Sequence, residues 1–326
     1  MGPQPAVAAV RHAVRRALAR HPADRMVWVA CSGGADSTAL AAALAFEAAR
    51  SGRPAGLITV DHGLQPDSAE QAARVAALGF ELGLQPVLQL PVSVTGSGGP
   101  EAAARAARYA ALAPYAAGGL VLLGHTADDQ AETVLLGLGR GSGPRSIAGM
   151  RPEDGNYLRP LLGLRRRDTE AACAALGLPV WPDPHNLDPR FRRVRVRTEV
   201  LPLLEDVLAG GVVEALARTA EQLREDLDTL HGLAERVLVH SYLSDGLHTE
   251  ELLAQPPAIL NRVVKAWAEA EGAGPLAAGQ VRELARLVTD WRGQGGVDLP
   301  GGFRAHRTSG RLVVSRSPNS PPRSLP

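Results

Sequence analysis

Six consecutive residues combine the types that could hold the phosphates of a nucleotide: Ser32, Gly33, Gly34, Ala35, Asp36 and Ser37. They follow a short β-rich run and precede an alanine-rich stretch, so the pattern predicts a strand, a glycine loop and a helix. Free N–H groups at the start of that helix favour an anion, and the glycines allow its close approach. The loop lacks the lysine and the spacing of a Walker A motif, so transfer of a γ-phosphate is not supported. A plain strand-to-helix turn with a serine cap is the alternative.

Acidic residues accompany this loop. Asp36 is unexpected beside a bound anion unless a divalent cation neutralises it. Further along the chain, Asp129 and Glu132 stand three residues apart on a predicted helix, and hence on one face of it. An exposed acidic first turn that complements the helix dipole would also explain this pair. We expect the pair to point into the same cleft as the loop.

The elements that must position these side chains alternate between strands and helices. Such alternation predicts an α/β fold with a doubly wound parallel sheet, whose ligands bind at the carboxyl ends of the strands. The predicted strands are residues 26–31, 55–60, 86–91 and 120–124, and the predicted helices are residues 7–20, 38–50, 68–83, 100–115 and 127–138.

The character of the chain changes over residues 140–197, which contain twelve Arg against six Asp and Glu, together with many Gly and Pro residues. Because the stretch has little periodicity, we expect it to be rich in loops. Its charge predicts a face that contacts the phosphates of a nucleic acid. An ordinary solvated surface is the alternative reading of the same charges.

A long amphipathic helix is predicted over residues 203–242, because apolar residues recur there every three or four positions. It would connect a catalytic domain, residues 1–202, to a small α+β domain, residues 243–316. The last ten residues, 317–326, are rich in Pro and Ser and are expected to be disordered.

The composition sets limits on the function. The chain has 326 residues, 35 Lys and Arg against 34 Asp and Glu, and 45% hydrophobic residues, which suits a globular protein of two domains. Its two cysteines, Cys31 and Cys173, form no CxxC motif or Cys/His cluster, so a disulfide framework, a zinc knuckle and an iron–sulfur cluster are disfavoured. No apolar run reaches the length of about 18 residues that a membrane span needs. We expect a cytoplasmic protein without a membrane partner.

The six-residue loop resembles the pyrophosphate-binding loop of the PP-loop ATP pyrophosphatases, which cleave ATP between the α and β phosphates. Three further segments narrow the resemblance: residues 61–64 (Asp-His-Gly-Leu), residues 124–133, which begin Gly-His-Thr-Ala-Asp-Asp, and residues 140–143 leading to Ala-Gly-Met at 148–150. Together they resemble the tRNA(Ile)-lysidine synthetase family, and the similarity covers most of the chain.

This resemblance implies a reaction in two steps. ATP would activate the C2 oxygen of the wobble cytidine in the CAU anticodon of tRNA(Ile), and the ε-amino group of free L-lysine would then displace AMP to give lysidine. ATP and Mg2+ are the implied cofactors. The domain at residues 243–316 is expected to bind and select the tRNA. The oligomeric state stays open, with a homodimer as one alternative.

The resemblance also implies roles for the residues that flank the loop. With residues 32–37, His62 and His125 are expected to bind the nucleotide, and a lone histidine in such a place is more often a hydrogen-bonding group than an acid or base. Arg108 is expected to reach a phosphate or the activated base. A surface ion pair is the alternative for this arginine.

The acidic residues are expected to be catalytic. Asp36 and Asp129 would hold Mg2+ and offset charge as pyrophosphate leaves. In the pair formed by Asp129 and Glu132, one carboxylate would bind the metal or position the substrate, and the other would hold the lysine ammonium. Which carboxylate does which stays open.

Two positions depart from the family pattern: Gln65 stands where Arg is common, and Pro182 where an acidic residue is usual. Their roles are therefore open. A tRNA thiolase of the same superfamily is an alternative, although it would need a reactive thiolate or an iron–sulfur site. A non-catalytic RNA-binding module is another, and turnover of ATP to pyrophosphate would exclude it.

Overall fold

The computed structural model describes residues 4–63, 67–95, 99–141, 143–182 and 188–316. The chain forms two compact units, Met1–Leu223 and Arg224–Pro326, and each has a sheet of its own. Position Gln65 and the tail expected to be disordered lie outside the described residues.

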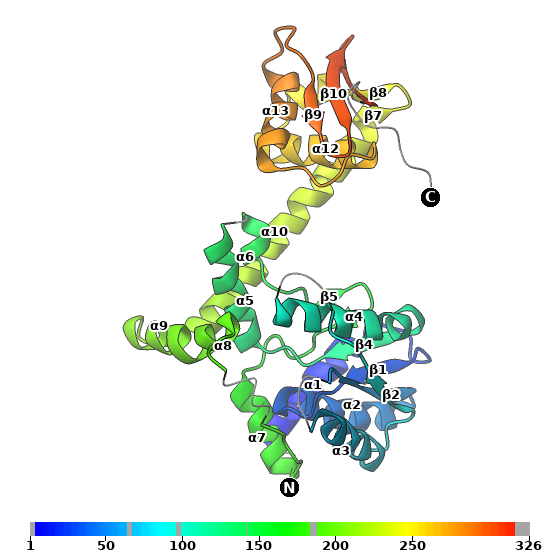
Figure 1. The fold of residues 1–326 in the computed structure, drawn as a ribbon, viewed down its shortest axis with the longest axis vertical. Helices are drawn as coiled ribbons and strands as arrows, with labels where there is room; N and C mark the ends of the chain where they lie inside the picture. Colours follow the sequence, from blue (N-terminus) through cyan, green and yellow to red (C-terminus); the bar gives the residue numbers. More distant parts are fainter. Residues whose placement is uncertain (1–3, 64–66, 96–98, 142, 183–187, 317–326) are drawn as a thin grey trace. The chain divides into compact units, whose positions relative to one another are not determined.

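The first unit is built on a six-stranded sheet in the order β3-β2-β1-β4-β6-β5 (Figure 1). All neighbouring strands pair in parallel except β5, which runs antiparallel at the edge. The predicted doubly wound α/β fold is confirmed. The strands are β1 Val27–Ala30, β2 Ala55–Asp61, β3 Val87–Pro91, β4 Leu120–Leu123, β5 Glu153–Asp154 and β6 Tyr157–Leu158.

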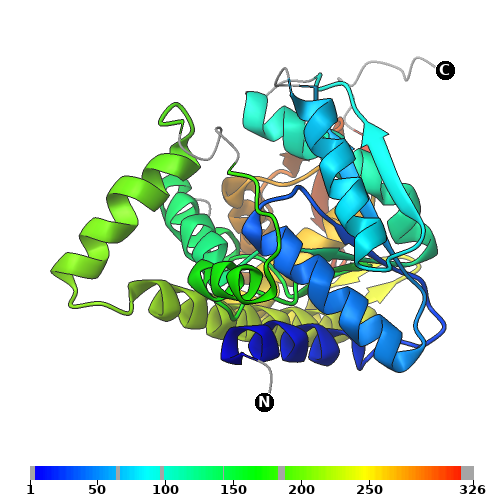
Figure 2. The ribbon, with the colours of Figure 1, turned by 90° about the horizontal axis from the view of Figure 1, so that it is seen from below.

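Helices cover both faces of this sheet. On one face α1, α2 and α7 pack against one another (Figure 2), and α4 packs on the opposite face. The helices of the unit are α1 Pro5–Leu18, α2 Ala35–Ser51, α3 Ser68–Glu81, α4 Pro100–Gly118, α5 Ala127–Arg140, α6 Pro144–Ile147, α7 Arg166–Leu176, α8 Arg192–Arg195 and α9 Leu201–Val207, followed by the start of α10 Val212–Ser241.

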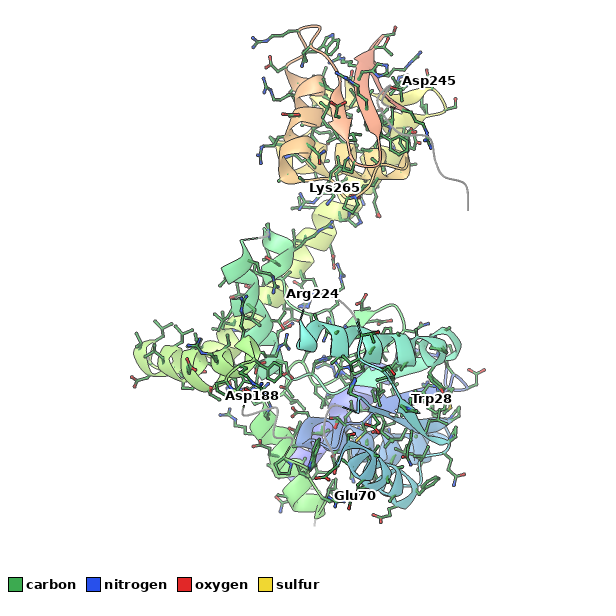
Figure 3. The ribbon with its side chains drawn as sticks, viewed as in Figure 1. Trp28, Glu70, Asp188, Arg224, Asp245 and Lys265 are labelled. Atoms are coloured by element: carbon green, nitrogen blue, oxygen red, sulfur yellow. The ribbon has the colours of Figure 1, made fainter. Side chains whose placement is uncertain are left out.

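Strand β1 is apolar at every position because helices cover both faces of the sheet there. Val27 and Val29 are fully buried toward α1 and α2. Trp28, which is labelled in Figure 3, packs on the other face, where its ring meets Tyr115 of α4 edge to face with 5.2 Å between centroids. A central parallel strand is covered on both faces, so a continuous hydrophobic run is expected rather than an alternating one.

The structure corrects one expectation in the first unit. Helix α2 begins at Ala35, within the predicted glycine loop, rather than at Thr38. Residues 140–197 are rich in loops, as predicted, but they also contain α7 and add β6 to the central sheet. The buried face of α7 is made of Thr169, Ala172 and Cys173, whose small side chains leave only a weak apolar pattern.

The predicted helix over residues 203–242 is broken near its start. Ala209, Gly210 and Gly211 all have positive φ angles, 61°, 88° and 75°, which separate α9 from the 30-residue helix α10. Glycine readily adopts this region of backbone conformation. Val213, just after the break, packs with Leu201 against Ala131 of α5.

The second unit combines helices with an antiparallel five-stranded sheet in the order β7-β8-β11-β10-β9. Its core centres on Trp267, which is fully buried. The predicted α+β character is confirmed, but β7 and β8 are too short to have been predicted. Its elements are β7 Tyr242–Leu243, β8 Gly246–His248, α11 Glu250–Leu253, α12 Pro257–Ala270, α13 Ala278–Thr289, β9 Val297–Leu299, β10 Phe303–Thr308 and β11 Arg311–Arg316.

Two glycines of α5 allow a matched test of how this helix is held. A Cβ atom on Gly137 would overlap the carbonyl oxygen of Ser146, whereas one on Gly139 would meet nothing within 4 Å. We expect Gly137→Ala to destabilise the chain by about 1–3 kcal/mol through overpacking. Gly139→Ala should be neutral or stabilise by up to about 1 kcal/mol, because alanine is the better helix former.

Urea unfolding followed by circular dichroism checks this prediction. Equal midpoints for the two variants would show that α5 does not depend on its close contact with Ser146.

Candidate active site

The glycine loop lies between β1 and α2 and is closed by a serine hydroxyl. Ser37 Oγ accepts a hydrogen bond from the backbone N–H of Ser32 (3.1 Å) and donates one to the carbonyl oxygen of Gly34 (3.0 Å). Gly33 has a φ angle of 88°, and a Cβ atom there would overlap the side-chain amide of Gln71. The loop therefore requires both its serine and its first glycine.

The start of α2 leaves backbone donors open at this loop. The N–H groups of Ala35, Asp36 and Ser37 lie in the first helical turn, where no intrahelical acceptor reaches them. The helix dipole adds partial positive charge at the same place. The loop therefore ends at a helix N-terminus with open N–H donors, as the predicted phosphate-binding role requires.

The end of β4 approaches the loop at Gly124. A Cβ atom there would lie 3.1 Å from Ser37 Cα and from the carbonyl carbon of Asp36, closer than a side chain normally packs. Since β1 and β4 are parallel neighbours, their carboxyl ends bring the loop and α5 to one edge of the sheet. His125 and the acidic residues of α5 follow directly.

Asp36 is held by two residues of α7. Its Oδ2 accepts a hydrogen bond from Arg166 Nε (3.3 Å), and its Oδ1 accepts one from the hydroxyl of Thr169. Thr169 is fully buried. Both oxygens of this carboxylate therefore already have a donor from the same helix.

The side chain of Asp129 both faces the site and caps the N-terminus of α5. Its Oδ2 accepts hydrogen bonds from the backbone N–H (2.8 Å) and the hydroxyl (3.1 Å) of Thr126. Its Oδ1 accepts one from Arg166 Nη2 (3.1 Å). Arg166 thus joins Asp129 to Asp36, so the two carboxylates predicted to hold a metal converge on one cationic group.

Glu132 lies deeper, one turn along α5, and its side chain is 0% exposed. Arg197 makes hydrogen bonds to both of its oxygens, from Nε (2.7 Å) and from Nη2 (3.3 Å). Arg166 Nη1 lies 3.9 Å from the same carboxylate. The ammonium group of a ligand could bind Glu132 only if it displaced the side chain of Arg197.

The electrostatics of the three carboxylates differ. Burial raises the pKa of Asp36 and of Glu132, against the influence of their arginine and threonine partners. Burial alone would also raise the pKa of Asp129, but the charges of Arg166 and Arg197 and the N–H of Thr126 together lower it. Asp129 is therefore the most firmly ionised of the three.

The other side of the site carries two histidines and an arginine from different elements. The Nδ1 atoms of His62 and His125 and the Nε atom of Arg108 are buried and have no hydrogen-bond partner among the described residues. The charge of Asp129 raises the pKa of both Arg108 and His125, against the effect of burial. Buried polar groups without partners are uncommon, so these atoms are candidates for contact with a ligand.

Their titration follows from this environment. Burial, together with the charges of Arg108 and Arg159 and against that of Asp129, lowers the pKa of His125 to about 3. Burial and the charge of Arg108 also lower the pKa of His62. At neutral pH both imidazoles are neutral hydrogen-bonding groups rather than charged acids.

Sequence reasoning missed the arginines that face inward. Besides Arg166 and Arg197, Arg165 bonds to Asp128 Oδ1 (3.1 Å) and to Glu214 Oε1 of α10 (2.6 Å). These side chains belong to the basic stretch that was expected to form a nucleic-acid face. The Arg-Arg-Arg run at 165–167 was the available signal, but nothing in its spacing indicates acidic partners elsewhere in the chain.

Other arginines of that stretch do lie on the surface. Arg190 is 85% exposed and bonds to Asp188 Oδ2 (2.6 Å), and Arg195 is 60% exposed and bonds to Glu199 Oε2 (2.7 Å). The stretch therefore combines inward arginines, which neutralise the acidic site, with outward ones that keep local partners.

The described residues include no group of three or more His, Cys, Asp or Glu side chains arranged to hold a metal. Likewise, none of the helices described has both the length and the apolar character to cross a membrane.

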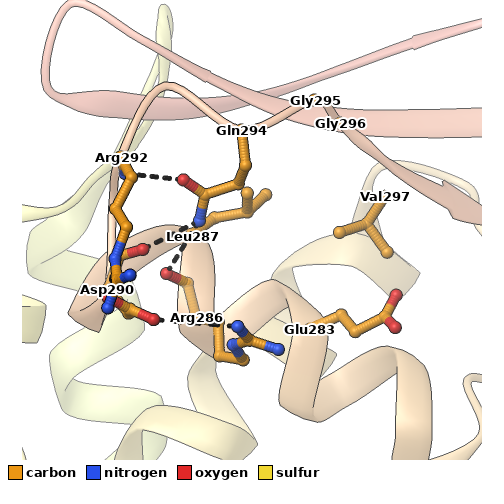
Figure 4. Close-up of a pocket in the computed structure, with 9 residues that line it drawn as sticks. All are labelled: Glu283, Arg286, Leu287, Asp290, Arg292, Gln294, Gly295, Gly296 and Val297. Carbon is orange, nitrogen blue, oxygen red and sulfur yellow. Dashed lines mark hydrogen bonds and ion pairs between the residues drawn. The ribbon is translucent and has the colours of Figure 1, made fainter.

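In the second unit, a hollow of about 310 Å³ lies beside the end of α13 (Figure 4). Asp290 pairs there with Arg286 and Arg292, so its charges are satisfied internally.

Comparison with known proteins covers both units. A family model described as a PP-loop domain matches residues 8–204, and one described as the TilS substrate binding domain matches residues 247–313. A tRNA(Ile)-lysidine synthase of Thermobifida fusca (strain YX) is 53% identical over 322 residues, which is 96% of this chain and 99% of that protein. A tRNA(Ile)-lysidine synthase of Mycolicibacterium paratuberculosis is 56% identical over 295 residues, 89% of this chain and 90% of that protein.

Among solved structures, the U34-tRNA thiolase NcsA from Methanococcus maripaludis aligns with a TM-score of 0.56 at 18% identity, over 68% of this chain and 80% of that one. This likeness concerns the fold alone. Thiolation is disfavoured here because Cys31 is buried and burial, together with Asp36, raises the pKa of Cys173 to about 11. With the phosphate loop in place and close relatives along nearly its full length, the chain belongs to the tRNA(Ile)-lysidine synthase family, ligases that use ATP to form a carbon–nitrogen bond.

Proposed function

We propose that this chain uses ATP to adenylate the C2 oxygen of the wobble cytidine in the CAU anticodon of tRNA(Ile), and that free L-lysine then reacts with the adenylated base. In the first step a bond forms between C2 oxygen and the α-phosphorus, and pyrophosphate leaves. In the second, the ε-nitrogen bonds to C2 and AMP leaves. The observation that carries this proposal is the convergence of Asp36, Asp129 and Glu132 beside the open N–H groups of α2.

The loop at residues 32–37 would bind the departing pyrophosphate through its backbone donors. Asp36 and Asp129 would hold Mg2+, and their fit is supported by their shared contact with one guanidinium group. Mg2+ commonly binds through one or two carboxylates together with substrate phosphates, so two protein ligands suffice. When bound, the ion supplies positive charge that offsets the charge developing on pyrophosphate.

The side of the site that carries His62, His125 and Arg108 would bind the bases and the α-phosphate. His62 and His125 have buried ring nitrogens that are open to hydrogen bonds, and Arg108 supplies a buried positive charge. A guanidinium group pairs well with phosphate oxygens. These three residues would therefore hold ATP and the adenylated cytidine in place.

Glu132 would receive the ammonium group of lysine. Arg197 is its hydrogen-bonded partner, while Arg166 and Arg193 each lie 3.9 Å away, so this buried carboxylate already sits among cationic groups. The burial that raises its pKa would also help the bound ammonium lose a proton, since a dry site disfavours charge. The amine must be neutral before it attacks.

The second unit, which matches the substrate binding domain over residues 247–313, would bind the body of the tRNA(Ile). A nuclease footprint confined to the first unit would contradict this. Since its substrate is a tRNA, we propose that the chain acts in the cytoplasm. A homodimer stays an open alternative.

The first prediction concerns the products of ATP. Wild type should release AMP and pyrophosphate, and Asp36→Ala should lower this rate by at least a hundredfold because the leaving pyrophosphate loses its cation. Thin-layer chromatography of labelled ATP checks the products. Glu70→Gln, on the exposed face of α3, is the matched control and should keep full activity. Stoichiometric ADP would refute the reaction.

The order of the two steps gives a second prediction. Without lysine, wild type should accumulate adenylated tRNA, and with lysine it should not. Glu132→Gln should accumulate adenylated tRNA even when lysine is present, because the amide cannot hold an ammonium group as the carboxylate does. Gel separation of tRNA labelled from α-labelled ATP measures this. Formation of lysyl-AMP without tRNA would place activation on the amino acid instead.

A third prediction follows from the titration of His125. Its pKa of about 3 in the folded chain lies below the ordinary value near 6.5, so the unfolded chain binds the proton first. Stability should be complete above about pH 6.5 and fall as the pH decreases toward 3, with a loss of about 2 kcal/mol at pH 5.

Urea midpoints at pH 7 and pH 5 measure this loss. His125→Asn should reduce the difference between the two midpoints. An equal pH dependence in wild type and this variant would show that His125 does not titrate as described.

A further inference from the structure

We infer that Arg166 is a positioning residue that keeps the cation-binding oxygens of the active site occupied until a divalent cation arrives together with ATP. This inference rests on the proposed function for the identity of the cation site. The competition between the guanidinium group and a cation for the same carboxylate oxygens can be measured without ATP or tRNA.

The position of Arg166 at the start of α7 singles it out. Its side chain, 22% exposed, contacts Asp36 at 3.3 Å, Asp129 at 3.1 Å and Glu132 at 3.9 Å. Its neighbour Arg167 is 72% exposed and only approaches Glu214, at 3.7 Å. Two adjacent arginines on one helix thus have opposite surroundings.

The oxygens that Arg166 occupies are the ones that a cation would need. Asp36 Oδ1 is engaged by the buried hydroxyl of Thr169, and Asp129 Oδ2 by the backbone and hydroxyl of Thr126. The remaining oxygens, Asp36 Oδ2 and Asp129 Oδ1, both accept hydrogen bonds from Arg166. A cation shared by the two carboxylates must displace this side chain.

The arginine also neutralises the charge that would attract a bare cation. Carboxylates gathered in a partly buried site repel one another unless a positive group lies among them. The planar guanidinium group does this with donors in a fixed fork, so it satisfies two acids at once. A divalent cation that arrives alone would meet both occupied ligands and a neighbouring positive charge.

ATP changes this balance because its phosphates offer the displaced guanidinium group a new anion. The expected result is that cation binding depends on the nucleotide. The carboxylates would then be filled by metal only when a substrate is present to use it, and Arg166 would pass from the acids to the phosphates.

Binding of Mn2+ alone to the full-length chain tests this inference. Electron paramagnetic resonance measures free Mn2+ in the absence of nucleotide and tRNA. We expect Arg166→Gln to bind Mn2+ at least tenfold more tightly than wild type, because the ligand oxygens are freed and the local charge becomes more negative. Arg167→Gln removes the same charge one residue away and should bind Mn2+ as weakly as wild type. Loss of structure would not produce such a gain.

Arg166→Lys provides a second variant should the glutamine variant fail to fold. It keeps the charge, but a single ammonium group cannot span both acids, so Mn2+ affinity should lie between those of wild type and Arg166→Gln. Wild type that binds Mn2+ alone at low micromolar concentration, or folded Arg166 variants with unchanged affinity, would overturn the inference. ATP turnover by wild type is assayed separately, so a failure of the proposed function is seen independently.

Discussion

Mutual repulsion among acidic side chains is the constraint around which the first unit is organised. Asp36, Asp129 and Glu132 reach one partly buried space from two helices, α2 and α5. Without compensation their charges would favour separation of those helices or protonation of the acids. Arg166 and Arg197 supply the compensation, which ties α7 and the π-helical segment Val196–Val200 after α8 to the sheet edge. The elements added after β4 are therefore part of the site and not an appendage to it.

The site has two chemically different sides. One is acidic and crowded with arginines, and the other has neutral imidazoles and a buried arginine, each with one buried nitrogen that has no hydrogen-bond partner among the described residues. Such separation suits a reaction in which a phosphate chain, a base and an amine must each find a different environment. It follows from the topology, because β1, β2 and β4 end at the same edge and each contributes one short connection.

Much of this arrangement was predictable from the sequence. The strands β1 to β4 were predicted because their runs are largely apolar, as parallel strands covered by helices are, and the glycine loop because its composition exceeds what a turn needs. The inward arginines were not predictable, since Arg166 and Asp36 are 130 residues apart and no local pattern pairs them. The predicted start of the long helix was also wrong. The apolar periodicity of residues 203–208 continues across Gly210 and Gly211, which interrupt the helix without altering the pattern.

The tight contact between Gly124 and the phosphate loop has an evolutionary consequence. A Cβ atom at 124 would require β4 or the start of α2 to shift by a few tenths of an ångström. The spacing between the loop and the carboxylates of α5 therefore depends in part on a backbone contact. Change in substrate size is more readily accommodated by the loops and by the second unit. Relatives with other substrates would be expected to differ there while retaining glycine at this strand end.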